Sequence, residues 1–210
     1  YSENVYCIDN LIQSLLLVVP RKAVYCGLSL GANIIASLAM NSPERVLGVI
    51  AIAGSPKFVS EDGFPGVDEG TAHSFSRRLE RSYKVCLSYF AALCVEGDPH
   101  KLELKKTLFS YANWRAQTGV LEKSLDLTLC LDNRKILNSL CFPQYYILAE
   151  GDQFARLALK RYLSRCKFIG EIDVIADASH ACILSHADEI CEKIFLFCDR
   201  YLENGYNEPE

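Results

Sequence analysis

The run VLGVIAIA at residues 46–53 constrains the fold of this 210-residue chain more than any other segment. It is an uninterrupted apolar stretch of strand length, rich in β-branched residues. A strand with one face in water alternates apolar and polar residues, whereas a parallel strand covered by helices on both faces does not. The run therefore predicts a buried parallel strand, which belongs in an α/β fold.

Further strand patterns occur along the chain and are separated by helical ones. Strand, helix and strand joined by short connections form a βαβ unit, and such units build a parallel sheet with helices on its faces. We therefore predict an α/β fold with a mostly parallel sheet. The expected strands are residues 22–26, 46–53, 144–149 and 168–175, and the expected flanking helices are residues 6–18, 32–40 and 187–202.

The middle of the chain, from about residue 57 to residue 140, has no convincing strand pattern. A turn cluster, GFPG at residues 63–66, is followed by amphipathic helical patterns near residues 69–95, 99–112, 119–129 and 133–140. This order predicts a helical insertion between two strands of one sheet. We expect a core made of residues 1–56 and 141–210, and an inserted helical lid made of residues 57–140.

Three of the predicted strands are each followed by a residue whose side chain can take part in catalysis. Ser29 follows the first strand within GLSLG, Asp152 follows the third within EGD, and His180 follows the fourth within DASH. The carboxyl ends of parallel strands meet at one edge of a sheet, where ligands bind in open α/β folds. The chain order Ser, Asp, His is that of the α/β-hydrolase nucleophilic triad.

Serine, histidine and aspartate together provide the groups that nucleophilic catalysis by a serine requires. A serine hydroxyl is a poor nucleophile unless a histidine accepts its proton, and the histidine needs a carboxylate to fix its tautomer. Gly27 and Gly31 permit a sharp strand-to-helix turn with Ser29 at its apex. The backbone N–H of Leu30 is then placed to donate to a developing oxyanion.

Other interpretations remain open from the residues alone. A serine between glycines also occurs in structural turns, and Gly-Asp is common in loops. Asp173 and Asp177 are alternative acids, although they adjoin the histidine in sequence. His186 is the rival to His180, but its position is that of a residue at the start of a helix.

Composition narrows the classes of partner. A net charge of −4 and a pI near 5.6 give no global reason to expect nucleic-acid binding, and no apolar run reaches membrane-spanning length. The ten cysteines are scattered without a CxxC pair or zinc-ligand spacing, which predicts free thiols in a reducing compartment. We expect a cytoplasmic protein with no metal and no cofactor.

With these residues identified, the chain resembles the α/β-hydrolases, and more narrowly the pimeloyl-acyl-carrier-protein methyl ester esterases of biotin biosynthesis. The resemblance covers nearly all of the chain. The matching segments are GLSLGANIIASLAMNSPERV around the serine, IAGSPKFVSEDGFPGV leading into the lid, YFAAL and LKKTL in the lid, ILAEGD at the acid and ASHACILSH at the histidine. SPKFVSEDGFPGV is the most specific of them, because GLSLG alone would fit many esterases, lipases and peptidases.

The resemblance implies a serine carboxylesterase that uses Ser29, His180 and Asp152 on a pimeloyl-carrier methyl ester. Phe90 in YFAAL matches the family's lid phenylalanine and implies a substrate contact. Lid arginines of the family meet the acidic carrier protein, and the basic residues available here are Arg77, Arg81 and Lys84 on one predicted helical face, and Lys101 on the next helix. A solvated helix face is the other interpretation of these residues. We expect a monomer that binds an acyl-carrier protein but neither nucleic acid nor membranes.

Two features depart from the family pattern. Nothing here corresponds to the His-Gly loop that supplies the second oxyanion donor, and about four strands are expected instead of eight, so we expect a C-terminal fragment of a longer protein. Tyr89 stands where the family has an arginine. These departures keep two other functions open: a broad-specificity short-chain carboxylesterase, and a catalytically silent hydrolase-like module that only binds partners.

Overall fold

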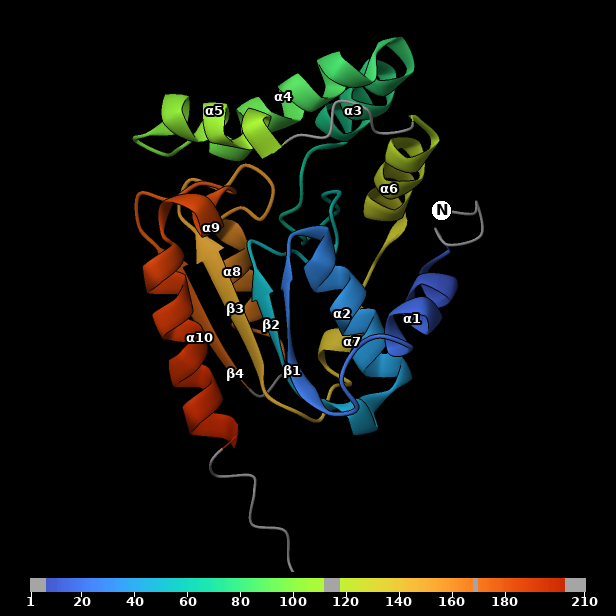
Figure 1. The fold of residues 1–210 in the computed structure, drawn as a ribbon, viewed down its shortest axis with the longest axis vertical. Coiled ribbons are helices and arrows are strands. Elements are labelled where there is room, and N and C mark those ends of the chain that lie inside the picture. Colours follow the sequence, from blue (N-terminus) through green and yellow to red (C-terminus); the bar gives the residue numbers. More distant parts are fainter. Residues whose placement is uncertain (1–6, 112–117, 168–169, 203–210) are drawn as a thin grey trace, which may run out of the picture.

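A computed structural model describes residues 7–111, 118–167 and 170–202. Its centre is a four-stranded parallel sheet whose strands lie side by side in chain order (Figure 1). The strands are β1 (Ala23–Leu28), β2 (Val46–Ile52), β3 (Gln144–Ala149) and β4 (Gly170–Ile175). The predicted α/β fold with a parallel sheet is confirmed.

Helices cover both faces of the two central strands. On one face, Ile50 of β2 belongs to a cluster that includes α10 (Ala187–Leu202). On the other face, Ala51 packs with residues of α2 (Leu30–Asn41) and α8 (Ala158–Leu163). Because neither face of β2 or β3 meets water, their sequences are continuous apolar runs without alternation.

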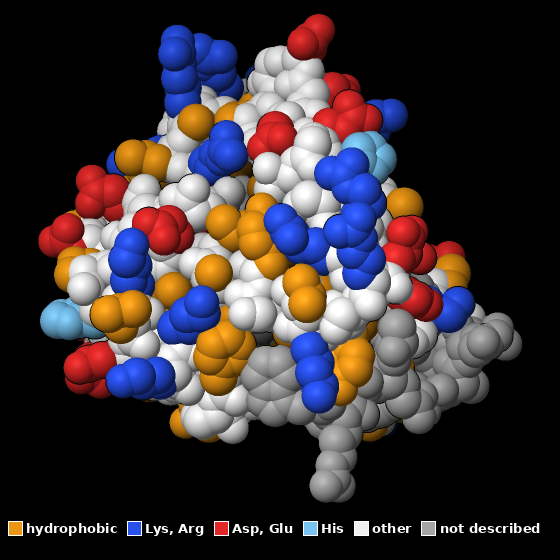
Figure 2. All heavy atoms as spheres, turned by 90° about the horizontal axis from the view of Figure 1, so that it is seen from above, with side chains coloured by type: hydrophobic (Ala, Val, Ile, Leu, Met, Phe, Trp, Pro, Cys, Tyr) orange, Lys and Arg blue, Asp and Glu red, His pale blue; other side chains and the backbone are white. Residues whose placement is uncertain are grey.

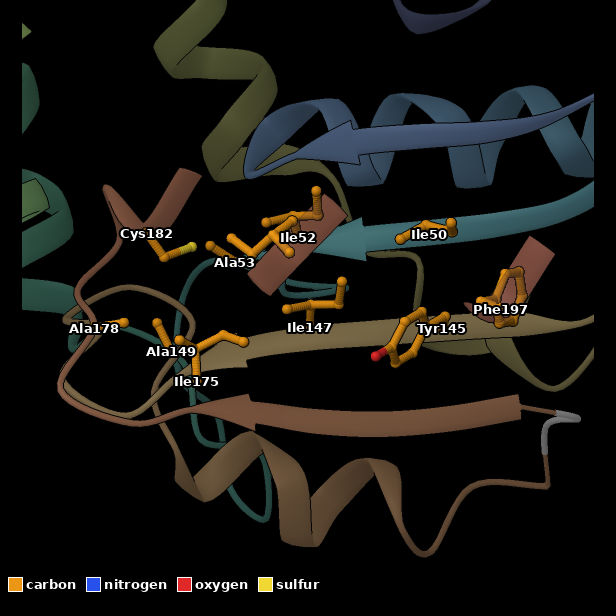
Figure 3. Close-up of a cluster of buried hydrophobic side chains, with 11 residues drawn as sticks. Ile50, Ile52, Ala53, Tyr145, Ile147, Ala149, Ile175, Ala178, Cys182 and Phe197 are labelled. Atoms are coloured by element: carbon orange, nitrogen blue, oxygen red, sulfur yellow. The ribbon is translucent and has the colours of Figure 1, made fainter. Parts of the chain in front are cut away.

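The cluster beneath α10 fixes the strands along their length (Figure 3). Ile50, Ile147 and Phe197 are at most 2% exposed, and Tyr145 stacks on Phe197 with ring centroids 5.3 Å apart. Complete burial of one such side chain contributes about 1.5–3 kcal/mol. This core therefore holds the strand ends, and with them the loops that follow, in fixed positions.

The remaining core elements are short or peripheral. They are α1 (Ile8–Leu16), the 3-10 helix at Pro43–Arg45, α7 (Arg134–Leu137) and α9 (Cys182–Ser185). The sequence patterns did not predict α8, α9 or the 3-10 helix, because each is too short to show a helical period. Tyr6 and Phe168 are the first residues of two predicted elements, and Ala112 is the last residue of another. All three lie outside the described residues. Nowhere in the described ranges does a helix have the length and apolarity needed to cross a membrane.

Four helices lie above the carboxyl ends of the strands (Figure 1), and we call them the lid. They are α3 (Glu69–Arg81), α4 (Tyr83–Val95), α5 (Lys101–Tyr111) and α6 (Thr118–Cys130). The single helical pattern predicted over residues 69–95 is thus wrong in one respect, because Ser82 is extended (φ −170°, ψ 120°) and breaks it in two. Consequently Arg77 and Arg81 lie on α3 but Lys84 lies on α4, so the three do not share one helical face.

The chain enters and leaves the lid at the same place. Lys57 and Asp132 form an antiparallel bridge, and Asn133 N donates to the Pro56 carbonyl at 2.8 Å. Beyond it, Leu137 of α7 is 1% exposed in the core cluster of α2 and α8. The division into a core and a lid of residues 57–140 remains a prediction, and we propose that the lid ends at Asp132.

Candidate active site

Ser29 occupies the turn between β1 and α2. β1 ends at Leu28 and α2 begins at Leu30, so Ser29 alone joins them, with φ 53° and ψ −118°. A non-glycine residue at positive φ is rare and costs of order 1–3 kcal/mol, which persists where the surroundings impose it. Gly27 makes the turn possible, because a Cβ there would lie 2.4 Å from the Gly31 carbonyl carbon. The hydroxyl therefore sits at the N-terminus of α2, as predicted for a strand-to-helix turn.

Asp152 lies in the loop after β3 and is 3% exposed. Its Oδ1 accepts hydrogen bonds from the backbone N–H groups of Phe154 at 2.7 Å and Ala155 at 3.1 Å. Its Oδ2 lies 2.9 Å from His180 Nδ1. Both carboxylate oxygens are thus held, and the second is directed at the imidazole.

His180 lies in the loop after β4 and joins the carboxylate to the serine. Its Nε2 is 3.0 Å from Ser29 Oγ. A carboxylate only accepts hydrogen bonds, so Nδ1 carries the proton and Nε2 is left to accept from the serine hydroxyl. The structure brings Ser29, His180 and Asp152 into one hydrogen-bonded chain.

The rival residues have other partners. Asp173 accepts from Tyr145 Oη at 2.7 Å and from Lys193 Nζ at 3.0 Å. Burial acts to raise the pKa of Asp173, but the Tyr145 and Lys193 hydrogen bonds outweigh it and hold that pKa below its usual value. Asp177 N donates to the Glu150 carboxylate, and His186 Nδ1 pairs with the neighbouring serine hydroxyl at 2.8 Å. Asp152 and His180 are therefore the pair that the structure brings to Ser29.

Leu30 begins α2, so its backbone N–H has no acceptor within the helix. Together with Ser29 and His180 it lines a hollow of about 20 Å³. That volume is enough for one water molecule but not for an ester substrate. The positive end of the α2 dipole favours negative charge at this point.

Aromatic side chains connect His180 to the lid. The Phe154 ring meets the imidazole edge to face, with centroids 4.8 Å apart. Phe154 also stacks on Phe90 of α4, with ring centroids 5.5 Å apart. Phe90, the predicted substrate-binding residue, thus reaches the site through Phe154, and it is 42% exposed.

Sequence reasoning missed Phe154 and Asn33, which both line the hollow. Asn33 Nδ2 donates to the Ser55 carbonyl at 2.8 Å, and Asn133 Nδ2 donates to Asn33 Oδ1 at 3.1 Å. The position of Asn33, four residues after Ser29 on the same helix face, was a usable signal. No comparable signal marked Phe154, because its role depends on where the lid lies.

The predicted carrier contacts lie on the lid, away from the hollow. Arg77, Arg81, Lys84 and Lys101 are all exposed, and Lys101 Nζ pairs with Glu96 at 3.1 Å. Seen from above, this side presents lysine and arginine side chains among acidic and hydrophobic ones (Figure 2). The guanidinium of Arg78, which the sequence analysis did not single out, lies 4.0 Å from the ring centroid of Tyr89.

Two thiols adjoin the site. Burial raises the pKa of Cys182 to about 12 and also raises that of Cys94, and the charge of Asp152 adds to both effects. Both thiols therefore stay protonated near neutral pH and are poor nucleophiles. Within the described residues, no three His, Cys, Asp or Glu side chains gather in a way that could hold a metal ion.

Comparison with known proteins finds relatives that are similar to this chain in sequence. No protein-family model matches the chain. The pimeloyl-[acyl-carrier protein] methyl ester esterase of Aliivibrio fischeri (strain MJ11) is 27% identical over 197 residues, which span 92% of this chain and 76% of that protein. The biotin biosynthesis bifunctional protein BioHC of Cellvibrio japonicus is 30% identical over 183 residues, which span 84% of this chain but 35% of that longer protein.

Solved structures with the same fold include several hydrolases. An esterase (EaEST) from Exiguobacterium antarcticum matches with a TM-score of 0.81 at 15% identity and covers 93% of this chain and 75% of its own. The enol-lactonase from Burkholderia xenovorans LB400 matches with a TM-score of 0.76 at 16% identity. The match covers 90% of this chain and 72% of the enol-lactonase. At these identities the likeness shows the α/β-hydrolase fold alone.

Proposed function

We propose that this chain, an α/β-hydrolase related in sequence to pimeloyl-[acyl-carrier protein] methyl ester esterases, is a serine carboxylesterase. In this proposal Ser29 is the nucleophile, His180 the general base and acid, and Asp152 the group that orients His180. The hydrogen-bonded chain from Ser29 Oγ through the imidazole to Asp152 Oδ2 is the observation that carries it. We expect no cofactor to take part.

Acylation begins when Ser29 Oγ attacks the ester carbonyl carbon and His180 Nε2 takes the hydroxyl proton. The carbonyl electrons move to oxygen, and the Leu30 N–H donates to the resulting oxyanion. When the tetrahedral intermediate collapses, the bond to the methoxy oxygen breaks. Nε2 returns its proton to that oxygen, methanol leaves, and the acyl group remains on Ser29.

Deacylation repeats these steps with water. His180 Nε2 takes a proton from water while the water oxygen attacks the acyl carbon. The bond to Ser29 Oγ then breaks, and the imidazole returns the proton to the serine. The products are a free carboxylic acid and the regenerated hydroxyl. Throughout, Asp152 stabilises the charged imidazole and fixes its orientation.

The substrate we propose is the methyl ester of a pimeloyl-acyl-carrier protein, whose hydrolysis frees a carboxylate for biotin synthesis. The names of the sequence relatives support this assignment. We propose that the lid moves to admit the ester, because the hollow at Ser29 has room for about one water molecule. We propose that Phe90 then contacts the acyl chain and that Arg77, Arg81, Lys84 and Lys101 meet the acidic carrier.

Genetic rescue tests this function. The protein should restore growth without biotin to a bacterial strain that lacks its pimeloyl-carrier esterase, and the Ser29→Ala variant should not. Rescue by Ser29→Ala would refute the assigned chemistry. A matched variant, Ser55→Ala, removes another hydroxyl beside the hollow and should still rescue, because Ser55 Oγ only donates to the Lys57 carbonyl.

A second candidate is a broad-specificity short-chain carboxylesterase. Tyr89, which replaces the family's lid arginine, favours it. Hydrolysis of a free methyl ester should be compared with hydrolysis of the carrier-bound one. A strong preference for the carrier-bound ester supports the first proposal, and equal rates support the second. Charge reversal at Arg77 and Arg81 should raise KM for the carrier-bound ester, whereas reversal at exposed Lys160 on core helix α8 should not.

We place the enzyme in the cytoplasm on the basis of its thiols. All ten cysteines are free, including the buried Cys86, Cys94 and Cys182. Free thiols persist where glutathione and thioredoxin keep them reduced. Mass spectrometry of the protein from non-reducing cell extracts should therefore find the cysteines unpaired, and stable disulfides would contradict this location.

A further inference from the structure

Where α4 ends and the turn to α5 begins, the backbone of the lid contacts the loops of the candidate site. At the end of α4, the Cys94 carbonyl accepts a hydrogen bond from Ala181 N at 2.9 Å. Ala181 directly follows His180. Cys94 and Val95 are 4% and 3% exposed, so this junction is buried. The end of α4 is thereby attached to the loop that carries the histidine.

Two residues further on, Gly97 packs against Gly151 backbone to backbone. A Cβ at Gly97 would lie 2.7 Å from both the Cα and the carbonyl oxygen of Gly151, and a Cβ at Gly151 would lie 2.8 Å from the Gly97 Cα. Both distances are shorter than any real Cβ contact. Gly97 also has φ +93°, which side chains rarely adopt. Only a pair of glycines permits this approach.

Gly151 in turn connects the two loops of the site. Its N–H donates to the Ala178 carbonyl at 2.8 Å, in the loop that leads to His180. The next residue is Asp152, whose carboxylate faces the imidazole. Gly97 therefore lies against the peptide that immediately precedes the proposed orienting carboxylate, and a Cβ at Gly151 would meet both Gly97 and the Ala178 carbonyl of the loop that leads to His180.

We infer that Gly97 is a positioning residue, and that its close packing on Gly151 sets the distance between Asp152 and His180. The inference rests on the proposed function of Asp152 and His180. A methyl group at position 97 would push the Gly151 peptide away and carry Asp152 with it. Because displacement of a reacting group by about 1 Å can cost about 10²-fold in rate, a small shift at this contact is enough to reduce catalysis.

The chain provides two matched controls for this inference. Gly63 shares the left-handed backbone of Gly97, with φ +79°, but a Cβ there meets nothing within 4 Å. Gly119 lies in lid helix α6 with open space around a Cβ. Gly63→Ala thus reproduces the backbone strain without the collision, and Gly119→Ala reproduces the change of residue without either.

The test measures the second-order rate constant with which a fluorophosphonate probe phosphonylates Ser29, with loss of fluoride, in the native 210-residue chain and in each variant. Folded fractions are matched by circular dichroism. Gly97→Ala should lower the rate by about 10²-fold, and both control variants should stay within about twofold of native. Equal rates for Gly97→Ala and native would overturn the inference. Absence of labelling in the native chain would instead refute the proposed function.

A double-mutant cycle shows whether Gly97 acts through the carboxylate. In an Asp152→Asn background, Gly97→Ala should cause little further loss, because the orienting charge is already gone. The same fold-loss in both backgrounds would overturn the inference, since Gly97 would then support the fold in general. If Gly97→Ala does not fold, Gly97→Asn serves in its place. Asparagine tolerates positive φ better but still brings a Cβ into contact with Gly151.

Discussion

Ser29 Oγ lies 3.0 Å from His180 Nε2, although 151 positions separate the two residues in the chain. Parallel pairing puts the carboxyl ends of all four strands at one end of the sheet, and because β1 and β4 are its two outer strands, the loop after β4 carries His180 across to Ser29. Asp152 reaches the other imidazole nitrogen from the loop after β3, which pairs with β4. The three side chains therefore owe their contact to the parallel strands and to the loops that follow them, and the buried sheet keeps those loops in place.

Asp152→Asn should reduce ester hydrolysis strongly while leaving the fold intact. The amide keeps the size of the carboxylate but not its charge, and it no longer fixes the imidazole with the proton on Nδ1. We expect kcat for a p-nitrophenyl ester to fall by about 10⁴-fold with little change in KM. Asp173→Asn is the matched control and should keep kcat within about twofold, because Asp173 bonds Tyr145 and Lys193. A larger loss for Asp173→Asn than for Asp152→Asn would contradict the assigned acid.

Phe154→Ala should weaken both the fold and the site. The ring is 5% exposed and packs between His180 and Phe90. We expect the free energy of unfolding in urea to fall by about 3–5 kcal/mol, as for other buried aromatic residues. Acylation of Ser29 should also slow, because the His180 imidazole loses the aromatic ring that packs against it. Phe195→Ala, at a side chain 67% exposed, should change stability by less than about 0.5 kcal/mol.

The ion pair of Asp132 and Arg134 at the base of the lid predicts that the stability of the protein depends on pH. The hydrogen bond from Arg134 lowers the pKa of Asp132 to about 2, against about 3.9 in an unfolded chain. A lowered pKa contributes stability that is present above pH 4 and is lost as the pH falls through about 2.

Asp132→Asn should therefore destabilise the protein at pH 6 and less so at pH 3. Because the Asp132 side chain is 36% exposed, solvent screening limits the effect at pH 6 to about 1 kcal/mol or less. Urea unfolding at the two pH values measures it. Asp126→Asn, at an exposed residue of α6, should differ from native by less than about 0.5 kcal/mol at both. An Asp132→Asn effect that grew toward low pH would contradict the assignment.

The buried thiols should resist modification until the protein unfolds. Burial raises the pKa of Cys182 to about 12, so at pH 8 only about one thiol in 10⁴ is ionised. With a maleimide, we expect peptides containing the exposed Cys130 and Cys141 to be labelled in the native protein. Cys94 and Cys182 should be labelled only in denaturant. Native labelling of Cys182 as fast as Cys130 would show that the junction beside His180 opens.

Sequence patterns predicted the sheet well, because each strand is a short apolar run between polar connections. β3 has the predicted bounds, residues 144–149. β1 continues two residues beyond its predicted end, because Gly27 and Leu28 still pair with Ala51 and Ile52 of β2. Gly27 therefore lies inside the strand, and the absence of a Cβ there allows β1 to pack closely against the start of α2.

The site was predictable for a related reason. The loops that follow the parallel strands are short, so their side chains stay near the carboxyl ends of those strands. Ser29, Asp152 and His180 could therefore be selected by their positions in the sequence. The contacts with the lid were not predictable in this way. Ser82 interrupts a helical pattern without a proline or glycine, and the meeting of Gly97 with Gly151 depends on where α4 ends in space.

The central claim is that Ser29 is an activated nucleophile, and labelling with a fluorophosphonate measures this most directly. Intact-mass and peptide analysis should find one probe on Ser29 of the native chain, and none after Ser29→Ala. Labelling should be strongly reduced by His180→Ala and unchanged by Ser55→Ala, which removes a different hydroxyl beside the same hollow. A native chain that stays unlabelled, or is labelled equally well after His180→Ala, would contradict the proposed esterase.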